Sequence, residues 1–148
     1  FFIMRKFFPP PLQALLAALL IRFIPLGQSF SLPWEFPAII LLVAIFIALA
    51  ALWQFQRQSA NIDPHNLAKT TQIVQQGIYA YSRNPMYLSL ALGLTAWWLY
   101  CGSWLSIIWL VGFVVLIEHL QIRPEERFLK GRFGKAYQVY CNNVRRWF

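Results

Sequence analysis

The sequence has few charged residues, and very few of these are acidic. Only 12% of its 148 residues are Asp, Glu, Lys or Arg, and only five carry a carboxylate. Because a soluble domain of this length needs a largely polar surface, this scarcity argues against a water-soluble protein. The net charge of +8 comes from thirteen Lys and Arg residues that cluster beside apolar runs. This pattern is typical of membrane orientation, and we expect no nucleic-acid partner.

Metal-binding and nucleotide-binding motifs are also missing. The two cysteines and two histidines form no C-x-x-C or H-x-x-x-H spacing, and the acids are too few for a dinuclear site. We therefore expect no metal. The seven glycines form neither G-x-G-x-x-G nor a P-loop, which excludes a Rossmann-type or P-loop nucleotide site.

Apolar residues, by contrast, make up 59% of the chain and gather in four runs, at 12–26, 36–55, 86–100 and 104–120. The second run holds 20 residues without a charge, which suits a hydrocarbon core of roughly 30 Å. Pro85 stands where a helix containing the third run would begin. Because only Cys101-Gly102-Ser103 separate the last two runs, these runs are predicted to form an antiparallel helical hairpin.

The positions of the cations predict the orientation of these runs. Lys and Arg residues lie in the N-terminal stretch, in the polar loop after the second run and in the tail from Arg123 onward, whereas the loops on the other side hold only Glu35. Both termini and the polar loop are therefore expected in the cytoplasm, with the protein in a bacterial inner membrane. Cys101 and Cys141 would then lie on opposite sides of the bilayer as free thiols.

The predicted fold class is therefore all-α: a polytopic membrane protein with four transmembrane helices, a C-terminal helical hairpin and cytoplasmic amphipathic tail helices. We expect one domain over residues 1–148, with two transmembrane helices in 1–60 and the polar loop, hairpin and tail in 61–148. Gly131 and Gly134 are expected to divide the tail into two short helices on the membrane surface. The first apolar run lacks a small-residue cleavage site, so no removed signal peptide is expected, and the initial Phe1 suggests that the natural start is missing.

Two adjacent acids, Glu125 and Glu126, come directly after the fourth run. Neighbouring helical residues point about 100° apart, so at most one of them is expected to face a pocket. Alternatively, both acids favour the N-terminal dipole of a helix that starts at Pro124. His65 and His119 are more typical of solvated or interfacial residues than of bases.

The segments GIYAYSRNPMYL, at 77–88, and EERFLKGRFGKAYQVYCNNVRRW, at 125–147, carry a family resemblance. Together with the hairpin between them, they resemble the integral-membrane methyltransferases that include isoprenylcysteine carboxyl methyltransferase and the bacterial phospholipid methyltransferase-like proteins. The resemblance covers about residues 70–147.

This resemblance implies a cytoplasmic pocket for S-adenosylmethionine (SAM) without a Rossmann fold. The residues that it places against the cofactor are Ile73, Val74, Tyr79, Asn84, Pro85, Tyr87 and Glu125. A sulfonium cation is stabilised by aromatic faces and a carboxylate, which the tyrosines and Glu125 would supply.

The acceptor implied by the resemblance is a lipophilic molecule that enters from the lipid bilayer. Its candidate contacts are Arg83, Gln121 and Arg123, although Arg83 is equally typical of an anchor at the lipid phosphates. Gln121 stands where eukaryotic carboxyl methyltransferases have a substrate-contacting Arg, which argues against isoprenylcysteine. Asn84 stands where many members have His, so it is not expected to act as a base. If the acceptor needs a base, the candidates are Glu126 and His119.

Two other functions remain open from the residues alone. The Arg-Asn-Pro-Met-Tyr step is partly shared with NADPH-dependent sterol-reductase-like membrane enzymes, although their tail pattern differs. A small membrane protein without enzymatic activity, whose polar residues pair with one another, is the other alternative.

Overall fold

The computed structural model describes residues 9–59 and 75–148, which are helical apart from short connections. The helices, in chain order, are α2 (Pro10–Phe23), α3 (Glu35–Ser59), the 3-10 turn η1 (Gly77–Ala80), α4 (Pro85–Cys101), the 3-10 turn η2 (Trp104–Ser106), α5 (Ile107–Ile117), the π-helical segment η3 (Glu118–Ile122), α6 (Arg123–Phe133) and α7 (Lys135–Asn143). No strand occurs in this part of the chain, where Ser29 and Ser103 form an isolated antiparallel bridge. The all-α expectation is confirmed for these residues.

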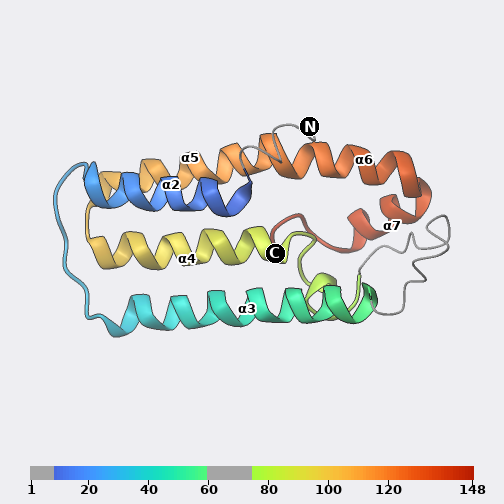
Figure 1. Cartoon of the computed structure of the whole chain (residues 1–148), viewed down its shortest axis with the longest axis horizontal. Coiled ribbons are helices and arrows are strands. Elements are labelled where there is room, and N and C mark those ends of the chain that lie inside the picture. The colour runs from blue at the N-terminus through green and yellow to red at the C-terminus, as the bar shows by residue number, and fades with distance from the viewer. Residues whose placement is uncertain (1–8, 60–74) are drawn as a thin grey trace.

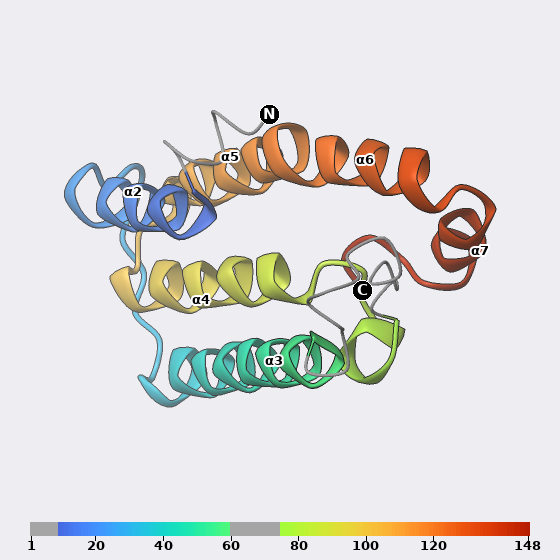
Figure 2. The same cartoon turned by 45° about the vertical axis from the view of Figure 1, so that its right-hand side comes forward.

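Helix α4 lies at the centre of the molecule. It packs against α3 on one side and against α2 and α5 on the other, as Figures 1 and 2 show. The core is built from apolar side chains of α2, α4, α5 and η3, namely Ala17, Ile21, Leu94, Trp98, Leu110, Phe113, Ile117 and Ile122. This central position explains why α4 can carry one wall of a site that its neighbours complete.

Helix α3 contacts α4 through small side chains and presents large ones to the outside. Ala44 and Ala51 are buried, which allows the two backbones to approach closely. The outward face carries exposed apolar residues along its length, including Ile39, Leu42, Phe46, Leu49 and Trp53. In water this surface would be costly, whereas in a bilayer it is solvated by lipid chains.

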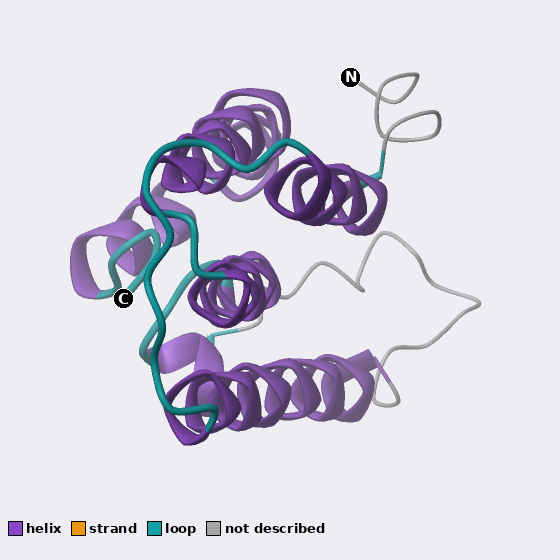
Figure 3. Ribbon diagram, turned by 90° about the vertical axis from the view of Figure 1, so that its left-hand side faces the viewer, coloured by secondary structure: helices purple, strands orange, loops and turns teal. Residues whose placement is uncertain are grey.

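The predicted hairpin is confirmed, and its turn depends on Gly102. This residue ends α4 in the left-handed conformation, with φ of 73°, which glycine adopts without steric cost. A Cβ atom at this position would collide with the carbonyl oxygen of Phe30. The amide of Phe30 donates to the carbonyl of Gly102 at 2.7 Å, so the connection between α2 and α3 is fastened to the turn. Figure 3 views the molecule from this end, where the connection passes from one side of α4 to the other.

Two helical segments of the described chain, Glu35–Arg57 and Trp104–Phe133, are long and apolar enough to cross a membrane. Helix α2 is apolar but has 14 residues, fewer than a bilayer requires. It ends at Phe23, two residues before Pro25, because the residue before a proline disfavours helical conformation. The expectation of four transmembrane helices therefore stays a prediction.

The fourth run continues into the tail without a break, which the sequence did not indicate. Helices α5, η3 and α6 succeed one another directly, and Ile122 and Arg123 both have helical backbone angles. Pro124 lacks an N–H and its ring crowds the carbonyl four residues earlier, so the helix widens locally, and the amide of Arg123 donates to Glu118 five residues back. The alternative that Glu125 and Glu126 merely stabilise a free helix N-terminus is therefore wrong.

The tail contains two helices, as expected, but only one of the two glycines separates them. Gly131 lies inside α6, where the continuous helix tolerates it at a small cost. Gly134, with φ of 59°, ends α6 and lets the chain turn into α7. Figure 1 shows α7 turning back from the far end of α6, so that the C-terminus lies beside the start of α4.

Candidate functional site

A pocket of about 370 Å³ lies where α4 begins, and we name it the Asn84 pocket. Its apolar side comes from the start of α2 and from α3, and its polar side comes from η1, the connection to α4 and α6. The residues that line it are Pro10, Pro11, Ala51, Leu52, Phe55, Tyr79, Arg83, Asn84, Pro85, Met86, Tyr87, Leu90 and Glu125. All the described residues that the family resemblance placed against a cofactor are in this set. Ile73 and Val74 lie outside the described residues.

The polar wall owes its position to Pro85. Proline at the first position of α4 forces the preceding residue out of the helical conformation, and Asn84 has φ of −135° and ψ of 60°. The Asn84 side chain forms no cap on α4. Its Nδ2 instead donates to the carbonyl oxygen of Arg146 at 2.9 Å, while its backbone amide donates to Ser82 Oγ at 3.2 Å.

Glu125 and Tyr87 also meet on the lining of the pocket. The hydroxyl of Tyr87, in the first turn of α4, donates to Oε1 of Glu125 at 2.7 Å. A hydrogen bond to a carboxylate is stronger than one between neutral groups, so each side chain fixes the other. Both groups line the pocket, which gives it an anionic centre beside an aromatic ring.

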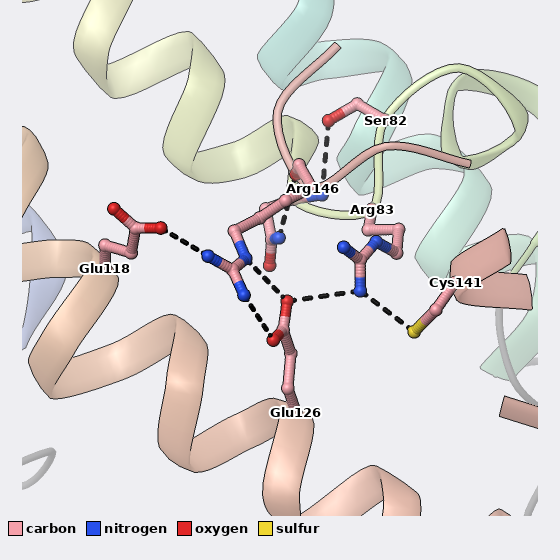
Figure 4. A network of polar contacts seen from close by, with 7 residues as sticks. Ser82, Arg83, Glu118, Glu126, Cys141 and Arg146 are labelled. Atoms are coloured by element: carbon pink, nitrogen blue, oxygen red, sulfur yellow. Dashed lines mark hydrogen bonds and ion pairs between the residues drawn. The ribbon is translucent and has the colours of Figure 1, made fainter. Parts of the chain in front are cut away.

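The adjacent acid, Glu126, points away into a network of arginines and glutamates (Figure 4). Its side chain is 11% exposed and accepts hydrogen bonds from Nε and Nη2 of Arg146, each at 2.9 Å. Nη1 of Arg83 lies 3.2 Å from the same carboxylate and also donates to Cys141 Sγ at 2.9 Å. Arg146 in turn pairs with Glu118. We refer to Arg83, Glu118, Glu126 and Arg146 as the arginine–glutamate network.

The remaining predicted site residues lie apart from the Asn84 pocket. His119 and Arg123 are exposed, and Gln121 is 1% exposed. Oε1 of Gln121 has no hydrogen-bond partner among the described residues. Arg83 lines the pocket, but its guanidinium is turned toward Glu126 and Cys141. The residues predicted as bases, Glu126 and His119, and those predicted as acceptor contacts, Gln121 and Arg123, are not brought to the pocket by this geometry.

Three tyrosines beside the pocket are held in their neutral form. Burial raises the pKa of Tyr79, and the charge of Glu125 adds to the effect. Burial also raises the pKa of Tyr137 and of Tyr140 on α7, with smaller effects from neighbouring groups. The Tyr140 hydroxyl donates to the carbonyl of Tyr79 at 2.7 Å, which attaches η1 to the tail. All three hydroxyls therefore keep their protons at neutral pH, and the hydroxyl of Tyr140 is a hydrogen-bond donor.

Arg146 is the residue that the sequence reasoning missed. The hydrogen bond to Glu126 raises its pKa, so the guanidinium remains charged. A signal was present in the sequence, because an arginine pair ends an otherwise amphipathic tail in a chain with only five acids. The sequence did not show that residues 144–148 return to the start of α4.

Metal binding finds no support in the described part of the chain. Residues 9–59 and 75–148 contain no group of three or more His, Cys, Asp or Glu side chains that could hold a metal ion. Cys101, at the end of α4, and Cys141, on α7, are both free. The expectation that no metal takes part stays a prediction.

Comparison with known proteins gives two matches. The sequence model of the family described as phospholipid methyltransferase matches residues 35–136, which is more than half of the chain. A protein of Haemophilus influenzae, described as an uncharacterized protein, is 44% identical over 62 residues, a stretch that covers 42% of this chain and 98% of that protein. No solved structure matches the chain.

Proposed function

Because the chain belongs to the phospholipid methyltransferase family, we propose that it transfers a methyl group from SAM to a lipophilic acceptor at the cytoplasmic face of a membrane. The observation that carries this proposal is the Asn84 pocket, which gathers Tyr79, Asn84, Tyr87 and Glu125 from separate parts of the chain. Its volume is within the usual range of small-molecule sites, about 300–1,000 Å³.

The donor set of the pocket suits the cofactor. A sulfonium needs a nearby negative charge and polarisable surfaces, and Glu125 with the rings of Tyr79 and Tyr87 offers both. The amide of Asn84 and the neutral hydroxyl of Tyr79 add hydrogen-bonding groups for the polar parts of SAM. When bound, SAM supplies an electrophilic methyl group, while these side chains orient it and the apolar wall excludes water.

The apolar wall indicates where the acceptor approaches. Leu52 and Phe55 of α3 line the pocket and are also 44% and 54% exposed at the surface of the helix. A lipid-soluble molecule beside α3 would therefore contact the pocket without passing through water. This arrangement supports a membrane lipid, or another lipophilic molecule, as the acceptor.

The position of the acids supports an acceptor that reacts without a base from the protein. Both oxygens of Glu126 accept hydrogen bonds from Arg146, and His119 is exposed away from the pocket. An acceptor that is already ionised, such as a carboxylate or a thiolate, needs positioning beside the methyl group and no proton removal.

We place α2, α3, α4 and α5 in the membrane, with the pocket and the tail helices at the cytoplasmic end. The exposed apolar face of α3 supports a lipid environment, and the cations of the tail lie toward the pocket end of the helices. A bacterial inner membrane is the location consistent with this arrangement.

Binding and transfer by the protein in lipid nanodiscs test the proposal. We expect calorimetry to detect SAM and its demethylated product, and not NADPH, and we expect labelled SAM to transfer its methyl group to a lipid-extractable acceptor of the source membrane. Glu125→Gln is the matched control, since it removes the charge while keeping the shape. Absence of SAM binding to the folded protein would refute the assignment, and NADPH binding would favour a reductase.

A further inference from the structure

The C-terminal residues 144–148, which we call the C-terminal strap, supply hydrogen-bond acceptors to the polar wall of the Asn84 pocket. The backbone amide of Arg83 donates to the carbonyl of Arg145 at 3.0 Å, and Nδ2 of Asn84 donates to the carbonyl of Arg146 at 2.9 Å. The backbone amide of Arg83 and the side-chain amide of Asn84, which directly precede α4, therefore both donate to the strap. Because Asn84 precedes a proline and cannot be helical, α4 itself does not supply them.

The strap is held in place by the side chains of two successive residues. Arg146 forms a two-pronged contact with the carboxylate of Glu126 and a further ion pair with Glu118. The next residue, Trp147, packs against the hydrophobic core. A bidentate arginine–carboxylate pair fixes direction as well as distance, which a single lysine contact does not.

On this basis, we infer that Arg146 is a positioning residue for the cofactor pocket. It acts through its own carbonyl, which orients the amide of Asn84, and it is itself oriented by Glu126 and Glu118. Glu125 and Glu126 then serve one site from two sides, with Glu125 on the pocket and Glu126 on the strap. The inference rests on the proposed binding of SAM, and it assigns a role to residues that do not line the pocket.

The test measures the dissociation constant for SAM and the midpoint of thermal unfolding for Arg146→Gln in nanodiscs. We expect SAM affinity to fall about tenfold, the size of one hydrogen bond. Arg145→Gln is the matched control, because it removes an adjacent exposed guanidinium and keeps the carbonyl that Arg83 uses. We expect its affinity to stay within about twofold of the unmodified protein.

A double-mutant cycle separates positioning from general stabilisation. If Arg146 acts through Asn84, then combining Arg146→Gln with Asn84→Ala weakens SAM binding no more than the stronger single variant. If Arg146 supports SAM binding by a route that does not involve Asn84, the two losses multiply, and the inference is overturned. Should Arg146→Gln fail to fold, the same cycle is run with Arg146→Lys, which keeps the charge and loses the two-pronged contact.

The outcomes for the proposed function are distinct from those for this inference. If the unmodified protein does not bind SAM, the proposed function is refuted. If the unmodified protein and Arg146→Gln bind SAM equally well, the proposed function is retained and the positioning role of Arg146 is refuted.

Discussion

At the scale of single residues, the site depends on two adjacent carboxylates with different surroundings. Glu125 accepts a hydrogen bond from Tyr87 on the pocket wall, whereas Glu126 is enclosed by Arg83 and Arg146. Successive side chains on a helix point about 100° apart, so one acid faces the pocket and the other faces the tail. Changing Glu125 is therefore expected to act on the pocket directly, whereas changing Glu126 is expected to act first on stability and only through Arg146 on the pocket.

Glu125→Gln is predicted to weaken SAM binding by about 1–3 kcal/mol, because it removes the charge beside the sulfonium. Glu126→Gln is predicted to lower the free energy of unfolding by about 1–3 kcal/mol and, because Arg146 is then held less firmly, to weaken SAM binding less than Glu125→Gln does. A fully buried pair would lose about 3–5 kcal/mol, but the partial exposure of Arg146 reduces the cost. Calorimetry and denaturant unfolding of both variants check this, and a greater affinity loss for Glu126→Gln than for Glu125→Gln would contradict it.

Tyr87 is predicted to contribute through its hydroxyl as well as its ring. If only the ring of Tyr87 contacted the cofactor, Tyr87→Phe would be nearly silent. The hydrogen bond to Glu125 changes this expectation, because loss of the hydroxyl leaves the carboxylate less firmly held. We expect Tyr87→Phe to weaken SAM binding about threefold to tenfold and Tyr87→Leu to weaken it further. Equal dissociation constants for Tyr87→Phe and the unmodified protein would show that the hydroxyl orients nothing.

At the scale of elements, the π-helical segment η3 sets the direction of both acids. It joins α5 to α6 without a break, and each residue added to or removed from such a segment rotates the helix beyond it by about 100°. Pro124 favours the wider geometry, because it cannot donate to the carbonyl four residues earlier. The pairing of Glu125 with Tyr87 is thus a consequence of a proline next to the acids.

Pro124→Ala is predicted to convert η3 toward a regular α-helix, since it restores the missing amide. The resulting rotation of α6 would move Glu125 away from Tyr87, so we expect SAM affinity to fall about tenfold or more while circular dichroism shows undiminished helix. Pro33→Ala, at an exposed position between α2 and α3, serves as the control and should bind SAM normally. Unchanged affinity in Pro124→Ala would mean that the segment keeps its register without the proline.

At the scale of the whole molecule, the charged groups gather toward one end of the helices. The arginine–glutamate network and most of the cations of the hairpin and tail lie at the end where α4 begins, and the turn at Gly102 lies at the other end. Arg22 is an exception to this distribution. It lies in the last turn of α2, whereas the comparison made from the sequence covered only the cations outside the apolar runs. The distribution otherwise agrees with the positive-inside rule and predicts a single orientation.

Cysteine labelling in sealed vesicles is predicted to report this orientation. Cys101 is the last residue of α4, beside Gly102, whereas Cys141 lies on α7 near the pocket. Both side chains are half-buried. We expect a small membrane-impermeant thiol reagent to modify Cys101 from outside, and Cys141 only after the vesicles are opened. The single variants Cys101→Ser and Cys141→Ser identify which thiol reacts, and the reverse pattern would invert the proposed topology.

The sequence by itself determined the helical elements and the residues that gather at the pocket. Apolar runs, Pro85 and the Gly102 turn are local signals, so they predicted α4, the hairpin and the α-only architecture. The motif around Asn84 and Glu125 predicted a set of residues whose described members line one pocket. Their role in binding SAM stays a prediction.

Only the tertiary structure decided the continuity of α5 with α6, the separate surroundings of the two acids and the return of the C-terminal strap. The hydrogen bond of Asn84 to Arg146 joins residues 62 positions apart, and the pair of Arg146 with Glu126 joins residues 20 positions apart. No local propensity encodes such contacts, because each becomes favourable only after packing of the helices has removed water from the groups that form it.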